Sequence, residues 1–173
     1  MPFIGQPGRD FHRAKADFTK GDDRGAARQI RIAAAIMKLE AGRHNAANKQ
    51  GLLTQANALD TLADKVEKKQ VSSVNDLDRA FAKADLALAR HYHLMAKAAM
   101  AAGNHRSTGT WLEAAAGSIS DAADWSGRKL AAGESATLKG VHDLGSKMAS
   151  GATWSGDQVK NGVSYLGAEI DKF

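Results

Sequence analysis

A glycine-marked repeat of eleven residues occupies positions 140–172 and constrains the fold more than any other feature of the chain. Glycine stands at the first and sixth positions of all three copies, which begin at Gly140, Gly151 and Gly162. On a helix that turns about 100° per residue, the mostly apolar second, fifth and ninth positions fall on one narrow face. Because eleven residues complete about three turns, that face runs nearly straight. The repeat therefore predicts a continuous amphipathic helix over residues 134–173. Its apolar stripe consists of Val141, Leu144, Met148, Ala152, Val159, Val163, Leu166 and Ile170.

The six glycines of the repeat oppose an isolated helix, because each costs about 0.8–1.0 kcal/mol relative to alanine. A helix of this composition needs its apolar stripe buried against something else. The glycines flank the stripe on both sides, where they would let another backbone approach closely. We therefore expect this segment to pack on the rest of the chain or to mediate self-association.

Two aromatic side chains of the repeat lie away from its stripe. Trp154 and Tyr165 both occupy the fourth position of their copies, well outside the apolar face on a helical projection. They are candidates for a second contact surface. The alternative is that a neighbouring helix of the same chain covers them.

The rest of the chain predicts an all-α protein, an antiparallel bundle of two long helical hairpins plus the C-terminal repeat helix. Only two prolines occur and 6% of residues are aromatic, which favours long helices over bulky strands. Apolar residues recur at helical spacing, and the expected helices cover 23–41, 44–70, 74–102 and 107–132. The expected organisation is an irregular basic arm over 1–20, a hairpin bundle over 21–133 and the repeat helix over 134–173.

The two hairpins carry signs of an internal duplication. An Ala-Gly-x-His sequence joins two helices in each, ending at His44 in the first hairpin and at His105 in the second. Such similarity could also arise by chance in an alanine-rich chain. The second hairpin resembles the tetratricopeptide signature over about 25 residues. The matching positions are Tyr92, Met95, Ala96, Ala99, Gly103, His105, Leu112 and Ala115.

The first hairpin departs from the tetratricopeptide pattern at Arg31 and Lys38, where large apolar residues would belong. The predicted helices are also long for a 34-residue unit. The plan of two alanine-rich hairpins that turn at a glycine is similar to the bacterial YfdX-type helical proteins. That resemblance implies a helical bundle and transfers no site residues.

The C-terminal repeat is similar to those of apolipoproteins, synucleins and late-embryogenesis proteins, and the resemblance implies binding to a lipid surface. Those families flank the stripe with lysines, whereas Lys147, Lys160 and Lys172 are the only lysines in this repeat. Residues 151–173 are net negative, with two lysines and three acidic residues. Peripheral lipid binding therefore stands as the alternative to a protein contact.

The net charge of +5 is concentrated near the N-terminus. Residues 1–50 hold ten Lys and Arg against five Asp and Glu. Such a segment could contact nucleic acid or anionic lipid, but interspersed acidic residues favour an ordinary solvated helix face. We expect a protein partner or self-association, a membrane surface as a possible partner, and no nucleic acid.

The sequence shows no pattern of an enzyme. Cysteine is absent, and neither a Gly-x-Ser-x-Gly motif nor a phosphate-binding loop occurs. We expect no cofactor. The weak metal candidates are His44 and His105, which begin paired helices and could meet; metal or small-ligand binding there is the second alternative.

These patterns predict a non-catalytic interaction or scaffold protein. No secretory leader is recognisable at the N-terminus, which predicts a cytoplasmic protein, or a periplasmic one if a leader has been removed. The apolar stripe of the repeat is the expected interaction surface.

Overall fold

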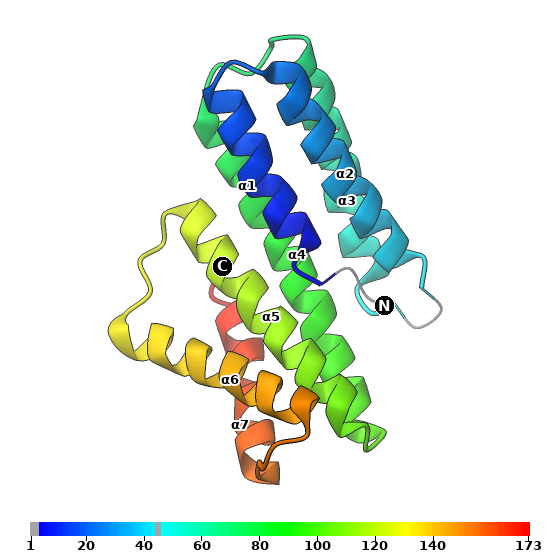
Figure 1. The fold of residues 1–173 in the computed structure, drawn as a ribbon, viewed down its shortest axis with the longest axis vertical. Helices are drawn as coiled ribbons and strands as arrows, with labels where there is room; N and C mark the ends of the chain where they lie inside the picture. The colour runs from blue at the N-terminus through cyan, green and yellow to red at the C-terminus, as the bar shows by residue number, and fades with distance from the viewer. Residues whose placement is uncertain (1–3, 44–45) are drawn as a thin grey trace.

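The computed structural model describes residues 4–43 and 46–173, and those residues form an all-α bundle of seven helices (Figure 1). The prediction of an all-α helical bundle is confirmed. The helices are α1 Gln6–Thr19, α2 Asp23–Ala41, α3 Lys49–Glu67, α4 Val74–Ala101, α5 His105–Ser126, α6 Ala132–Ser150 and α7 Gly156–Ile170.

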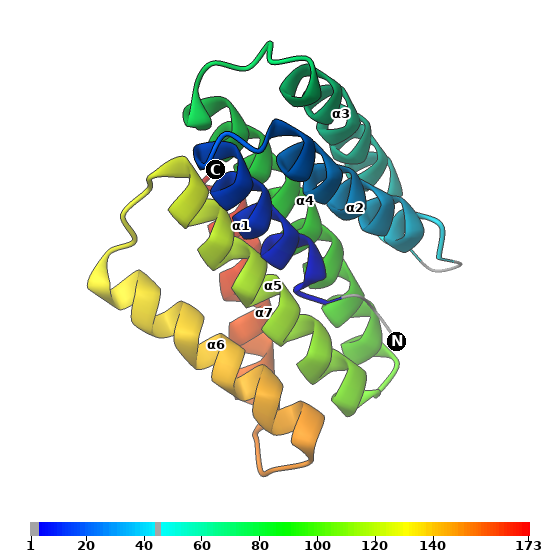
Figure 2. The same cartoon turned by 45° about the horizontal axis from the view of Figure 1, so that its top comes forward.

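Helix α4 is the centre of the molecule and packs against α1, α3, α5 and α7. Its N-terminal half lies beside α1 and α3, and its C-terminal half lies beside α7 (Figures 1 and 2). The buried face of α4 includes Leu77, Phe81, Leu88 and Tyr92, at helical spacing. The long α4 therefore joins a first layer of three helices to the C-terminal helices.

The prediction of an irregular arm over residues 1–20 is wrong, because Gln6–Thr19 forms α1. Pro7 stands in the first turn of this helix, where the missing N–H of proline removes no helical hydrogen bond. Phe11 is fully buried and stacks on Phe81 of α4 with ring centroids 4.5 Å apart. Lys15 reaches Asp78 of α4 at 2.8 Å. Aromatic packing and an ion pair thus dock this basic segment on the bundle.

The boundaries of α2 and α4 agree with the sequence pattern, whereas α5 ends earlier than expected. Gly127 takes a left-handed conformation with φ +67° and stops α5, so the helix does not continue to residue 132. The two proposed hairpin turns also differ in conformation. Gly103 is left-handed with φ +69°, whereas Gly42 keeps a right-handed φ of −79°.

The prediction of one continuous helix over 134–173 is also wrong, because residues 151–155 separate α6 from α7. Gly151 ends α6 in a left-handed conformation with φ +81°. Ser155 then begins α7 with a capping box: its hydroxyl accepts from Gln158 N, and Gln158 Oε1 accepts from Ser155 N. Ala152 falls in this linker and is exposed, so it does not belong to a stripe.

Candidate functional site

Most of the repeat stripe is buried within this one chain. Helix α6 crosses α5, and α7 lies along α4 and α5 (Figure 1). Leu144 is half-buried and keeps part of its surface open to solvent. The stripe residues that become buried are Val141, Met148, Val159, Val163, Leu166 and Ile170.

A pair of glycines makes the crossing of α5 and α6 unusually close. A Cβ atom on Gly145 would lie 2.6 Å from Gly109 O and 2.6 Å from Glu113 N. A Cβ atom on Gly109 would lie 2.5 Å from Gly145 O. Both side-chain positions are therefore filled by the other helix, as expected for small residues that let two backbones approach.

The other repeat glycines serve different purposes. Gly162 faces Val141 at an ordinary contact distance of 3.5 Å, and Gly167 faces the ring of His93 at 3.1 Å. A Cβ atom on Gly140 or Gly156 would meet nothing within 4 Å. Close packing thus explains some of the repeat glycines and leaves the exposed ones without a packing role.

The two off-stripe aromatics, Trp154 and Tyr165, contact residues of their own chain. The ring of Trp154, in the α6–α7 linker, lies against His105 at the start of α5 with centroids 4.6 Å apart. The hydroxyl of Tyr165 donates to Glu134 O at 3.0 Å. Both side chains are half-buried, so they connect elements of the chain and keep only part of their surface open to solvent.

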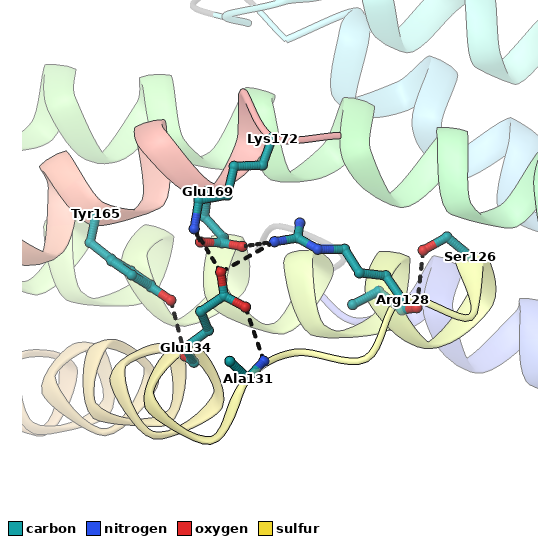
Figure 3. A network of polar contacts seen from close by, with 8 residues as sticks. Ser126, Arg128, Ala131, Glu134, Tyr165, Glu169 and Lys172 are labelled. Atoms are coloured by element: carbon teal, nitrogen blue, oxygen red, sulfur yellow. Dashed lines mark hydrogen bonds and ion pairs between the residues drawn. The ribbon is translucent and has the colours of Figure 1, made fainter.

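A cluster of charged residues, here called the clasp, ties both ends of the α6–α7 unit together (Figure 3). Arg128 Nη2 lies 2.7 Å from Glu169 Oε1, and Lys172 Nζ lies 2.8 Å from Glu169 Oε2. Lys172 Nζ also lies 2.7 Å from Glu134 Oε1, and this hydrogen bond lowers the pKa of Glu134. Glu169 is completely buried, so the two cations offset the cost of removing its charge from water.

A groove of about 460 Å³ opens between α6 and α7. Val141 and Leu144 line it from α6, and Gly162 and Tyr165 line it from α7. Gly140 contributes an open backbone surface to its wall. The groove is therefore the place where the repeat still offers apolar surface to another molecule.

Only one of the two histidines that were the weak metal candidates lies in the part of the chain that the structure describes. His44 lies outside the described residues, and His105 contacts Trp154. Two further histidines bond backbone carbonyls: His91 contacts Ala47 O, and His93 contacts Val163 O at 2.9 Å. Within residues 4–43 and 46–173 no group of three or more His, Asp or Glu side chains could hold a metal ion.

Sequence reasoning missed the clasp because its members are spread over residues 128–172 and depend on where α6 and α7 cross the bundle.

No described helix is both long and apolar enough to cross a membrane. Comparison with known proteins found no matching family model, no matching curated protein and no matching solved structure.

Proposed function

We propose that this chain is a non-catalytic interaction protein that self-associates through the groove between α6 and α7. The observation that carries the proposal is the groove itself, which keeps an apolar strip at Val141 and Leu144 between polar walls that include Asp143, Lys147 and Gln158. Leu144 remains half-buried on its wall, and Gly140 gives an entering side chain room to approach the backbone. Such a channel suits one or two branched apolar side chains from a partner helix.

A second copy of the chain carries side chains of the required kind on α2. Leu39 is 59% exposed and Ile32 is 41% exposed, which makes them the most exposed large apolar side chains of the described residues. They stand seven positions apart, so they lie on one face of the helix. An apolar ridge of this spacing matches a groove that runs between two helices.

Charge favours the same pairing. Residues 1–50, which include α2, hold ten basic and five acidic residues. Residues 132–173, which form the α6–α7 unit, hold four lysines and five acidic residues. The basic surface of one copy would therefore approach a slightly acidic surface of the next without repulsion. Because ridge and groove are different surfaces, the contact is head-to-tail.

Lipid binding through the repeat is the less favoured function, since the stripe it would use is already buried. Val159, Val163 and Leu166 would have to leave α4 and α5 before they could reach a bilayer. That exchange would also expose the apolar surface of α4 and α5 that these side chains cover. The groove needs no such rearrangement.

The experiment is a measurement of mass in solution over a range of concentrations, by sedimentation equilibrium or light scattering. We expect the average mass to rise above the 18.3 kDa of one chain as concentration increases. Leu39→Lys should return the chain to a monomer by removing the ridge. Gly140→Leu should do the same from the other side, by filling the groove at a position where a Cβ atom meets nothing within 4 Å.

Leu94→Lys is the matched control, because Leu94 is 36% exposed on α4 and belongs to neither surface. Its mass should follow that of the unmodified chain. A chain that stays monomeric at every concentration, or a Leu39→Lys variant that associates as well as the Leu94→Lys variant, would contradict the proposal. Gain of helicity with anionic vesicles would instead support the lipid alternative.

A further inference from the structure

A second cavity, of about 270 Å³, shares no lining residue with the α6–α7 groove, and none of the predicted site residues lines it. The start of α1, the middle of α4, the face of α5 and one residue of α6 enclose it. Pro7 and Leu88 give it apolar walls. Its volume exceeds the roughly 150 Å³ that accommodates a benzene molecule in an engineered protein cavity.

Two aspartates line this cavity and form no close ion pair, and the only cation that acts on either of them among the described residues is His12, on Asp121. Asp85 of α4 is 1% exposed, and its Oδ2 accepts a hydrogen bond from Trp125 Nε1 at 2.9 Å. Asp121 of α5 is half-buried. Burial raises the pKa of both carboxyl groups, and the charge of Asp121 raises that of Asp85 further. In the part of the chain that the structure describes, neither forms an ion pair within 4.0 Å with a Lys, Arg or His nitrogen.

A tyrosine adds a second, independent sign of a missing ligand. Tyr92 lines the same cavity and is 1% exposed, with its ring stacked on Trp111 at 5.7 Å between centroids. Its hydroxyl is buried and has no hydrogen-bond partner among the described residues. Buried hydroxyl groups are nearly always paired in proteins, so an unpaired hydroxyl on a residue that lines a cavity indicates a partner molecule. Its pKa is raised by burial first and then by the nearby charges of Glu40 and Asp85.

We propose that this cavity binds a small organic ammonium ion, an amine with a compact apolar body. The ammonium group lies between Asp85 and Asp121 and donates to both carboxylates, and the apolar body rests on Pro7 and Leu88. The hydroxyl of Tyr92 completes the polar end of the site. An ammonium ion supplies the positive charge and the donors that these carboxylates lack.

The chemistry of the lining argues against an inorganic cation or an anion. A divalent metal ion takes six or more oxygen ligands at close range, and the described residues hold no such cluster. An anion would meet the carboxylates of Asp85, Glu113 and Asp121, and His142 is the one basic side chain among the lining residues. The combination of carboxylates at one end and apolar walls beside them fits an amine with a hydrocarbon body.

The test is isothermal titration calorimetry of the full chain with 2-phenylethylamine and with 2-phenylethanol, which has the same body and no charge. We expect saturable one-to-one binding of the amine and at least tenfold weaker binding of the alcohol. Asp85→Asn should weaken amine binding at least tenfold, because it removes the charge but keeps an oxygen for Trp125 Nε1. Asp76→Asn removes an exposed carboxylate at the start of α4, outside the cavity, and should bind as the unmodified chain does.

A second pair of variants keeps the test independent of any effect of Asp85 on folding. Gly117 lines the cavity, and a Cβ atom there would meet nothing within 4 Å. Gly117→Leu should fill the cavity and abolish binding, whereas Gly117→Ala should leave it intact. Equal affinity for amine and alcohol, no saturable binding at millimolar amine, or undiminished binding by Gly117→Leu would each overturn the proposal. None of these outcomes depends on whether the chain self-associates.

Discussion

The crossing of α5 over α6 is so close that a single methyl group should disturb it. Gly145→Ala would place a Cβ atom 2.6 Å from backbone atoms of Gly109 and Glu113, well inside the 3.4 Å at which ordinary contact begins. Neither neighbouring atom can rotate away, because both belong to the helix backbone. Helix α6 must therefore move away from α5, and packing around Met148 must loosen with it.

The size of the effect follows from two opposing contributions. Forcing an extra methyl group into packed structure costs about 1–3 kcal/mol. Replacing a helical glycine by alanine gains about 0.8–1.0 kcal/mol. We expect Gly145→Ala to lower the free energy of unfolding by up to about 2 kcal/mol. Gly140→Ala, on the same helix but with open space around it, should raise that free energy by about 0.8–1.0 kcal/mol.

Urea denaturation followed by circular dichroism measures both free energies by linear extrapolation. The gain in helix propensity is common to the two variants. The difference between their free energies of unfolding therefore isolates the cost of the close approach. That difference should be about 1–3 kcal/mol. If Gly145→Ala is stabilised as much as Gly140→Ala, the two helices do not meet at Gly145 and the reasoning fails. A double variant with Gly109→Ala and Gly145→Ala should lose less free energy of unfolding than the two single variants lose together, because one displacement of α6 relieves both contacts.

Three further predictions concern stability. Truncation before Glu134 exposes the faces of α4 and α5 that the C-terminal helices cover, so circular dichroism and light scattering should show a partly unfolded, aggregating product. Because the pKa of Asp85 is raised in the folded state, that state holds its proton more tightly than the unfolded chain does. The contribution of Asp85 to stability should therefore fall as pH rises from about 4 through this raised pKa, and Asp85→Asn removes that contribution. Denaturation across that range should show a difference in the free energy of unfolding that widens in favour of the variant. Arg128→Ala, which leaves buried Glu169 with one cation, should lower the free energy of unfolding by roughly 1.5–3 kcal/mol, and more than Lys172→Ala.

Helices α2 and α4 could be predicted from local patterns alone. Residues Ile30, Ala33 and Met37 repeat at helical spacing, and they are fully buried on α2. Helix α1 could not be recognised in this way, because Pro7 and Gly8 suggest a loop while the burial of Phe11 depends on Phe81, seventy residues further along the sequence. The stacking of those two rings is a tertiary contact, and no local periodicity records it.

The polar sites were beyond prediction for the same reason. Asp85 and Tyr92 stand seven positions apart on α4, a spacing that places them on one face but says nothing of a cavity. The cavity exists because the start of α1, with Pro7, closes over that face. Because the sequence predicted an irregular arm in place of α1, it could not predict the cavity that α1 encloses.

The division of the repeat into two helices shows how far a periodic pattern determines conformation. Glycine at the first repeat position lies within a helix at Gly140, ends α6 at Gly151 and packs on Val141 at Gly162. The same residue at the same repeat position thus takes three roles, because glycine permits each and dictates none. The break between α6 and α7 falls in the second copy of the repeat. There Ala152 and Ser155 stand where the other two copies have valine and leucine. Too little apolar surface remains there to hold a helix together through its glycines, and Ser155 with Gln158 supplies the capping box that begins a new one. Restoring the apolar pattern with Ser155→Leu would remove that cap, so α7 should lose helicity at its first turn, as amide hydrogen exchange at Gln158 and Val159 would report.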